Sequence, residues 1–215
     1  QFLEQAINSV LQQSYDNFGY FVVDGGSTDR SLEIIRKYET GLTGWRSQRD
    51  NGQSEAINDG WQKLGEVDLF AWLNADDYFL PGAFQTIADN FVDCRRKGLN
   101  VGIFAGSGFK VNREGKTLKS VEVSNINARC PHSVLQFLQP SSFFSGDAIR
   151  QVGLLDQDLE YTMDWDLILR ITKEHSSRYI DTPLSCQRVY EQTNIFIINN
   201  YSWNVISHFW KRISL

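Results

Sequence analysis

The feature that most constrains the fold is a short apolar run, residues 69–73, which leads directly into Asn74, Ala75, Asp76 and Asp77. A continuous apolar run of this length, bounded by turn residues, is typical of a strand buried on both faces of a sheet. Such strands belong to α/β folds, in which ligands bind at the carboxyl ends of the strands. The carboxylates at the end of this run therefore indicate both a fold class and the place of a binding site.

Helical and strand patterns alternate through the first hundred residues. The spacing of apolar residues predicts helices at 2–11, 32–38, 54–64 and 81–97, and short strands at 20–23, 45–48 and 69–73. This order predicts a parallel sheet with right-handed crossovers. A unit of this kind normally begins with a strand, so we interpret the first strand as missing before Gln1. Because residue 1 is not Met, we expect the native N-terminus to lie upstream.

The pattern changes near residue 100. Two strand-like segments, 101–111 and 117–123, flank a turn that contains Gly115, which predicts a β-hairpin. A further strand at 141–144 and a helix at 164–174 follow. We therefore expect one domain with two halves, 1–100 and 101–198, and then an amphipathic helix over 199–215. Two roles stay open for that helix: packing against the domain, which is commoner, and lying on a membrane surface.

Composition excludes several classes of protein. A hydrophobic share of 41% in 215 residues is ordinary for a globular domain, and a net charge of −5 without a basic run argues against nucleic acid as a partner. No apolar stretch approaches the ~18–20 residues of a membrane-spanning helix. Cys94, Cys130 and Cys186 form neither a disulfide framework nor a zinc pattern. This cysteine usage fits a reducing compartment, so we expect a cytoplasmic protein, at the inner face of the membrane if the last helix binds lipid.

Several motifs in a fixed order resemble family 2 glycosyltransferases with the GT-A fold. They are DGGSTD at 24–29, DNGQSEAINDG at 50–60, WLNADD at 72–77 with PG at 81–82, QPSSFF at 139–144, GLLD at 153–156 and MDWDLILR at 163–170. Each motif alone is weak, but their order and spacing are specific and cover roughly residues 1–190. The resemblance implies an α/β fold of the GT-A type: a Rossmann-like, mostly parallel central sheet with helices on both faces and a smaller β-hairpin region on the acceptor side.

The resemblance also implies a reaction. It is the inverting transfer of a sugar from a nucleoside diphosphate sugar, with a UDP-sugar favoured, to a glycan or lipid-linked acceptor in cell-surface polysaccharide assembly. Residues 1–100 would bind the donor and 101–198 the acceptor. Since the chain is acidic and has no Arg cluster near the motifs, we expect Mn²⁺ or Mg²⁺ to neutralise the diphosphate leaving group. The sequence does not indicate an oligomeric state.

Donor-site residues follow from the matched motifs. In the family's Asp-x-Asp motif the last Asp carries the metal and the first lies near the ribose, which makes Asp76 the expected metal ligand and Asn74 a weakened ribose contact. Asp77 is a spare carboxylate, for which a donor-sugar contact and a helix N-cap role both stay open. Asp24 and Asp50 are expected on the nucleobase side, with turn roles as the alternative for both.

Acceptor-side and catalytic residues follow in the same way. Asp164 is the expected base, with an N-cap of the following helix as the alternative; Met163 stands where relatives usually carry Glu. Trp165 could stack on a sugar, although packing is favoured. Gln139 is expected to line the acceptor side.

The segment after the last core strand departs from the family. Relatives often carry a metal-side His there, and here Tyr190 replaces it, a poor ligand because the pKa of a phenol is about 10. Arg188, two residues earlier, could contact the diphosphate or lie on the surface.

Two other functions stay open. Gly25, Asn74, Met163 and Tyr190 all depart from the family pattern and favour a degenerate nucleotide-binding module without transfer activity. A nucleotidyltransferase would also use a sheet edge, acids and a metal. It usually has a Gly-rich, basic phosphate loop, and none is evident in the sequence.

Overall fold

The computed structural model describes residues 2–123, 137–159 and 161–190. The predicted helix at 199–215 lies outside them. In chain order the elements are α1 (Leu3–Leu11), β1 (Phe21–Asp24), α2 (Ser31–Tyr38), η1 (Glu39–Gly41), β2 (Gly44–Ser47), α3 (Gln53–Leu64), β3 (Leu69–Phe70), β4 (Tyr78–Phe79), α4 (Ala83–Arg96), β5 (Val101–Val111), β6 (Thr117–Val121), η3 (Gln139–Ser141), β7 (Ser142–Ser145), α5 (Gly146–Val152), α6 (Met163–Glu174) and β8 (Ser176–Arg188).

Within the described residues the predicted helices and strands are present, one of them shortened; two strands and one α-helix were not predicted. The apolar run at 69–73 forms strand only at Leu69 and Phe70, which pair with β7. Strands β4 and β8 and helix α5 were not predicted. Among the described residues, no helix is both long and apolar enough to cross a bilayer.

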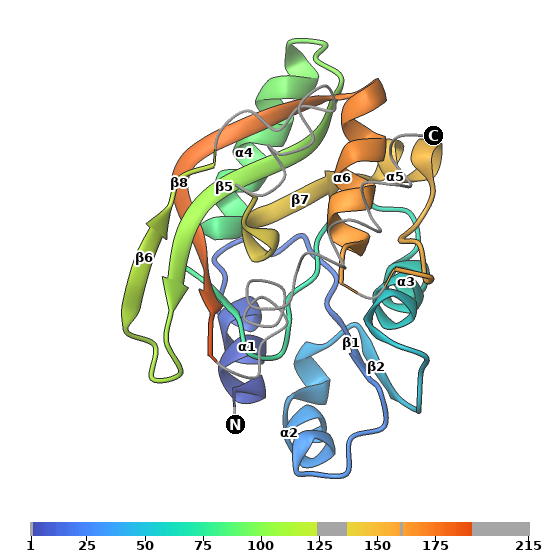
Figure 1. Ribbon diagram of the computed structural model, residues 1–215, viewed down its shortest axis with the longest axis vertical. Helices are drawn as coiled ribbons and strands as arrows, with labels where there is room; N and C mark the ends of the chain where they lie inside the picture. Colours follow the sequence, from blue (N-terminus) through green and yellow to red (C-terminus); the bar gives the residue numbers. More distant parts are fainter. Residues whose placement is uncertain (1, 124–136, 160, 191–215) are drawn as a thin grey trace.

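The described strands form two separate sheets (Figure 1). Strands β1 and β2 pair in parallel, and the second sheet has the order β3-β7-β5-β8-β4, with β6 also beside β5. In the second sheet only the β5–β8 pair is parallel. The α/β class is confirmed, but these pairings make the sheet mixed rather than mostly parallel. The β5–β6 pair is antiparallel because a tight hairpin can only join antiparallel strands, whereas β3–β7, β5–β7 and β4–β8 pair strands that lie far apart in the chain.

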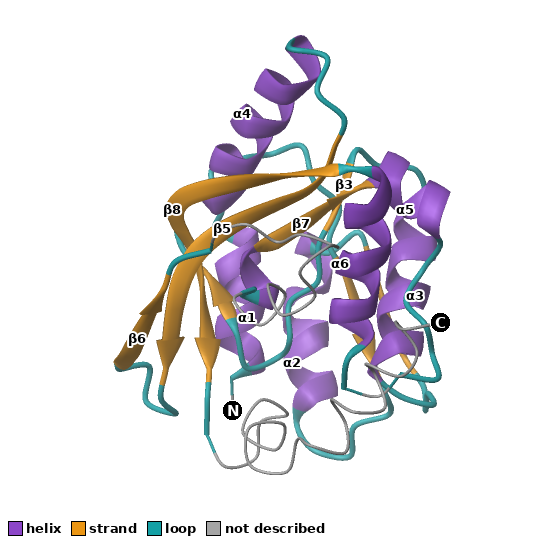
Figure 2. Cartoon of the chain, turned by 45° about the horizontal axis from the view of Figure 1, so that its top comes forward, coloured by secondary structure: helices purple, strands orange, loops and turns teal. Residues whose placement is uncertain are grey.

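Helices cover both faces of the larger sheet. Ile103 and Ala105 of β5 belong to the apolar cluster that contains α6, whereas Phe104 belongs to the cluster that contains α4. Side chains of a strand alternate between its faces, so α4 and α6 pack on opposite sides of β5. Figures 1 and 2 show this arrangement, with α5 beside α6.

Candidate functional site

The loop from Asn74 to Asp77 joins β3 to β4 and carries the proposed donor-site residues. Asp76 is partly exposed, whereas only 2% of Asp77 is exposed. Asp77 Oδ1 accepts a bond from the backbone N–H of Arg188 at 2.8 Å, and its Oδ2 accepts a longer one from Asn74 Nδ2 at 3.4 Å. Burial, helped by the charge of Asp76, raises the pKa of Asp77 well above its usual range. Asp77 is therefore a structural link between this loop and β8.

Neither acid of the pair caps a helix. Helix α4 begins at Ala83, with Gly82 in the left-handed region (φ 79°) at the N-cap and no side-chain bond to the helix end. The N-cap alternative for Asp77 is therefore wrong.

Arg188 is buried at the end of β8, with 5% exposed, so the surface alternative is wrong. Its guanidinium donates to the backbone carbonyl of Asp76 and to Gln5 Oε1, each at 2.6 Å. It also lies over the ring of Phe2, 4.3 Å from the centroid, and 5.1 Å from that of Tyr78. Arg188 thus fixes the backbone of Asp76 while leaving the carboxylate of Asp76 to other partners.

Tyr190 lies directly against the expected metal ligand. Its hydroxyl donates to Asp76 Oδ2 at 3.1 Å. Burial, followed by the negative charge of Asp76, raises the pKa of Tyr190, so the phenol stays protonated and acts as the donor. The residue that replaces the family's His therefore holds one of the two carboxylate oxygens of Asp76.

Asn74 sits in a chain of side-chain amides. Gln53 Nε2 donates to Asn74 Oδ1 at 2.7 Å, and Asn74 Nδ2 lies 3.4 Å from Gln139 Oε1. Gln139 in turn donates to the backbone carbonyl of Trp72 at 2.9 Å. The structure thus places Gln139 beside Asn74, where its buried side chain supports the β3–β4 loop. A role for it on the acceptor side stays a prediction.

Asp24 ends β1 and is 7% exposed. Its Oδ2 accepts bonds from Ser47 Oγ at 2.6 Å and from the N–H groups of Gly26 and Ser27 at 3.1 and 3.0 Å. Burial alone would raise the pKa of Asp24, but the bonds from Ser27, Ser47 and Gly26 outweigh burial and lower it. The bonds from Ser47 and from the N–H groups of Gly26 and Ser27 all reach Oδ2. The turn role predicted as the alternative for Asp24 is therefore present.

Asp50 lies against Gly25, the residue that follows Asp24. A Cβ added at Gly25 would be 2.9 Å from Asp50 Oδ2, so the Asp50 carboxylate fills the space beside Gly25. Asp50 Oδ1 also accepts the N–H of Gly52 at 3.1 Å, which is the turn role predicted as its alternative. Asp50 thus brings a carboxylate to the side of Gly25, one of the positions that depart from the family pattern.

Asp164 lies in the first turn of α6. The N-cap position belongs to Thr162, so the N-cap alternative for Asp164 is wrong. Its Oδ1 accepts the backbone N–H of Trp165 at 2.9 Å. Burial raises the pKa of Asp164 to about 6. The partly buried Trp165 side chain packs against the core cluster around α6, in line with the favoured alternative, and stacking on a sugar stays a prediction.

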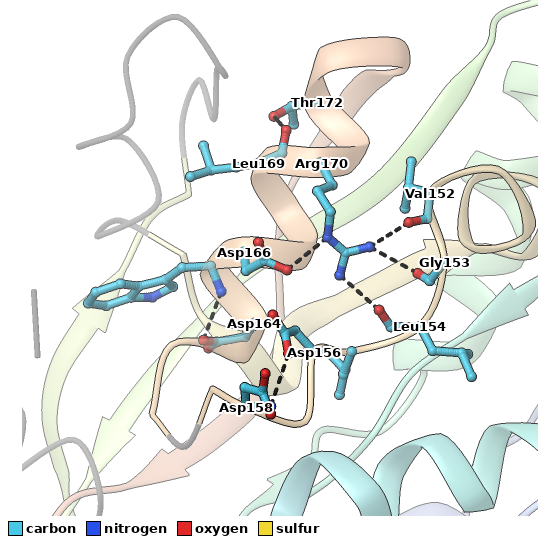
Figure 3. A network of polar contacts seen from close by, with 12 residues as sticks. Val152, Gly153, Leu154, Asp156, Asp158, Asp164, Asp166, Leu169, Arg170 and Thr172 are labelled. Carbon is cyan, nitrogen blue, oxygen red and sulfur yellow. Dashed lines mark hydrogen bonds and ion pairs between the residues drawn. The ribbon is translucent and has the colours of Figure 1, made fainter. Parts of the chain in front are cut away.

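Two clamps hold the segment that leads into α6. Asn58 of α3 donates to the carbonyl of Leu155 at 2.9 Å and accepts its N–H at 3.0 Å. Arg170 of α6 pairs with Asp166 at 2.8 Å (Figure 3). Its guanidinium also donates to three successive carbonyls, those of Val152, Gly153 and Leu154, at 2.7–3.1 Å.

Helix α3 connects all parts of the site. Its first residue, Gln53, follows the Asp50 loop and bonds to Asn74, while Ser54 and Asn58 bond to the segment before α6. Sequence reasoning missed these three residues. The signal was available, because they are polar residues on the helix side that carries Ile57 and Trp61.

Metal ligands do not form a ready-made cluster. Over the residues that the structure describes, no three His, Cys, Asp or Glu side chains gather closely enough to hold an ion. Asp76, with Oδ1 outside the Tyr190 bond, is the carboxylate best placed to offer an oxygen.

Comparison of the sequence with known proteins finds glycosyltransferases both among family models and among individual relatives. Residues 1–153 match the family described as Glycosyl transferase family 2. A protein of Rickettsia typhi named as an uncharacterized glycosyltransferase is 24% identical over 188 residues, which cover 84% of this chain and 57% of that protein. The chain thus spans little more than half the length of this relative.

Solved structures show the same fold. Residues 1–349 of TarS from S. aureus, in complex with UDP, give a TM-score of 0.67 at 16% identity and cover 92% of this chain and 59% of that one. The mannosyltransferase PcManGT from Pyrobaculum calidifontis, in complex with GDP-Man and Mn²⁺, gives 0.70 at 14% identity over 100% of this chain and 61% of that one. These likenesses confirm the predicted GT-A fold.

Proposed function

This chain belongs to glycosyl transferase family 2, and we propose that it transfers a sugar from a nucleoside diphosphate sugar, preferably a UDP-sugar, to a hydroxyl of a glycan or lipid-linked acceptor. The observation that carries the proposal is the convergence on α3: Gln53 joins the Asp50 loop to Asn74, and Ser54 and Asn58 join the same helix to the segment before Asp164. Donor-side and base-side residues thus share one support at the carboxyl end of β1, where α/β folds bind ligands.

Asp24 and Asp50 form the nucleoside side of the proposed site. Asp24 would accept a donor hydroxyl or base N–H through Oδ1, since the bonds from Ser47, Gly26 and the Ser27 N–H reach Oδ2. Asn74 is fixed by Gln53 and would contribute a neutral contact near the ribose. The UDP and GDP-Man in the compared structures are the ligands of those proteins and motivate the nucleotide class tested below.

Asp76 would hold the divalent cation that the family implies. Mg²⁺ typically takes one or two carboxylates and completes its shell with substrate phosphates and water, so the single partly exposed carboxylate of Asp76 fits it, and Mn²⁺ shares this preference for oxygen ligands. When bound, the cation would supply Lewis-acid neutralisation of the diphosphate leaving group. The bond from Tyr190 to Asp76 Oδ2 competes for one oxygen and should weaken that binding.

Asp164 would take the proton from the attacking acceptor hydroxyl. The acceptor oxygen then bonds to the anomeric carbon from the face opposite the diphosphate, the bond to the diphosphate breaks, and the configuration inverts. A base works best when its pKa lies near the working pH, and burial brings the pKa of Asp164 to about 6. Arg188 and Asp77 would hold the β3–β4 loop rigid without touching the substrate.

Release of nucleoside diphosphate from a panel of sugar donors with Mn²⁺ tests the proposal. We expect Asp164→Asn to lower the rate about 10²–10⁴-fold while nucleotide binding persists, because only the proton acceptor is lost. Asp76→Ala should lower both the rate and Mn²⁺-dependent binding. Asp181→Asn, an exposed acid on β8, is the matched control and should match the wild type.

Three other outcomes would contradict the proposal. Equal background rates in the wild type, Asp164→Asn and Asp76→Ala would favour a nucleotide-binding module, the alternative that the Tyr190–Asp76 bond supports. Release of pyrophosphate instead of nucleoside diphosphate would favour a nucleotidyltransferase. Product with retained anomeric configuration would contradict direct displacement.

A further inference from the structure

Three side-chain amides, those of Gln53, Asn74 and Gln139, form a chain of contacts that ends on the backbone carbonyl of Trp72. Each amide has one oxygen, which accepts hydrogen bonds, and one NH₂ group, which donates them. A backbone carbonyl can only accept. Gln139, which lies 2.9 Å from the carbonyl of Trp72, therefore presents Nε2 to it, and this contact fixes which way round the Gln139 amide lies.

The orientation of Gln139 fixes that of the other two amides. Gln139 Oε1 lies 3.4 Å from Asn74 Nδ2, and Asp77 Oδ2 lies 3.4 Å from the same nitrogen. Asn74 thus turns its NH₂ group to two oxygens and its own Oδ1 to Gln53. Gln53 in turn presents Nε2 to Asn74 Oδ1, at 2.7 Å. The remaining amide atom of Gln53, Oε1, is therefore an acceptor that lies outside the chain of amides.

These contacts give a physical reason for the Asn at position 74. An Asp here would bring a carboxylate oxygen close to Gln139 Oε1 and to the Asp77 carboxyl group, where a donor is needed. The Asn74 amide supplies that donor, but its Oδ1 is then occupied by the short bond from Gln53. The acceptor that remains at this place is consequently Gln53 Oε1, one amide further along the chain of contacts.

Gln53 also stands between the two parts of the proposed donor site. It is the first residue of α3, directly after the loop in which Asp50 lies against Gly25, and it bonds to the loop that carries Asp76. The first loop is the proposed nucleoside side, and the second is the proposed diphosphate side. Because the ribose joins the base to the diphosphate, its hydroxyls would lie between these loops. The side chain of Gln53 is partly exposed and can meet them.

We propose that Gln53 Oε1 accepts a hydrogen bond from a ribose hydroxyl of the donor, and that Asn74 and Gln139 are the positioning residues that orient it. This inference rests on the proposed function, because it assigns a further residue to the same donor site. The contact selects ribonucleoside diphosphates over their deoxy counterparts. An acceptor that meets a C–H group instead of a hydroxyl loses its hydrogen bond.

Binding of UDP and GDP and of their 2′-deoxy and 3′-deoxy analogues, each with Mn²⁺ and measured by isothermal titration calorimetry, tests the proposal. We expect at least one deoxy analogue to bind the wild type about ten-fold more weakly than its parent, since one hydrogen bond is lost. Gln53→Met has a similar shape but no acceptor oxygen, so it should bind the parent and that analogue with nearly equal affinity. Gln62→Met, at an exposed position of the same helix, is the matched control and should discriminate like the wild type.

Gln53→Glu separates a contact with the ribose from a purely structural role. An ionised Glu can accept a bond from a hydroxyl, but it cannot donate to Asn74 Oδ1. We therefore expect Gln53→Glu to keep the preference for the parent nucleotide over the deoxy analogue. If Gln53 acted only by holding Asn74, Gln53→Glu would lose this preference as fully as Gln53→Met.

Three results would overturn the Gln53 contact while leaving the donor site in place. They are equal binding of the parent nucleotide and both deoxy analogues by the wild type, a preference that persists in Gln53→Met, and a preference that is lost in Gln53→Glu. If neither UDP nor GDP bound the wild type, the proposed function itself would be wrong, and the Gln53 contact with it.

Discussion

Asp164 is partly buried, although its carboxylate must ionise to act as a base. Burial raises its pKa to about 6, while an unfolded Asp titrates near 4. Between these values the folded chain holds a proton that the unfolded chain has released, so the free energy of unfolding falls as pH rises from about 4 to about 6. The ionised base therefore costs stability at neutral pH.

We expect Asp164→Asn, besides its lower transfer rate, to be more stable than the wild type at pH 8, by about 1–3 kcal/mol. At pH 4 the two should be nearly equal, because the folded Asp164 is then neutral and the unfolded one is still about half protonated. Urea unfolding at the two pH values measures the difference. In the wild type the rate should rise with pH through an apparent pKa of about 6.

Urea unfolding and the pH dependence of the rate can also contradict the role of Asp164 as the base. A variant that is less stable than the wild type at pH 8, or a rate that does not change between pH 5 and 7, would mean that Asp164 is not a buried base. Asp181→Asn is again the matched control and should change neither quantity.

Single residues were predicted unevenly from the sequence. The family pattern placed Tyr190 near the metal ligand, and its bond to Asp76 Oδ2 agrees with that placement. The surface alternative for Arg188 failed because its burial depends on Phe2 and Gln5, more than 180 residues away in the chain. No local pattern carries that information.

Helix α6 is the element whose position matters most for the proposed base. The planar guanidinium of Arg170 donates hydrogen bonds to three backbone carbonyls at the end of α5 and in the turn after it. It also forms an ion pair with Asp166. Lysine could keep the ion pair with Asp166, but its single ammonium group cannot reproduce the hydrogen bonds of the guanidinium to these three carbonyls.

We therefore expect Arg170→Lys to lower the free energy of unfolding by about 1–3 kcal/mol, since carbonyls at a helix end lose their donors. Lys173→Ala, at an exposed position of the same helix, is the control and should stay within about 0.5 kcal/mol. Chemical denaturation measures both. Equal stability of Arg170→Lys and the wild type would show that the hydrogen bonds of the Arg170 guanidinium do not stabilise the turn after α5.

Helices with a strong periodic spacing of apolar residues were predicted well, whereas strands that depend on pairing with distant strands were predicted poorly. Helices α1, α3, α4 and α6 follow apolar spacing and appear close to their predicted bounds. Strand β8 was missed because its sequence is largely polar and contains Pro183; its long pairing with β5 makes it a strand. The opposite error occurred at 69–73. This apolar run predicts a strand of five residues, but only Leu69 and Phe70 pair with β7.

At the scale of the molecule, the GT-A fold was predicted from ordered motifs and confirmed by comparison. The mixed character of the larger sheet was not predicted, because the order and direction of its strands depend on pairing between segments far apart in the chain. The division into a donor half and an acceptor half stays a prediction.

The central claim is a nucleoside diphosphate site that uses a cation at Asp76, and melting temperatures with UDP and GDP, each with and without Mn²⁺, test it most directly. A ligand at about 100 times its Kd stabilises the folded state by about 2.7 kcal/mol, or roughly 5–10 °C for a chain of this size. We predict a Mn²⁺-dependent rise with UDP in the wild type and in Asp164→Asn, and its loss in Asp76→Ala. No shift with either nucleotide, or an equal shift in Asp76→Ala, would contradict the account.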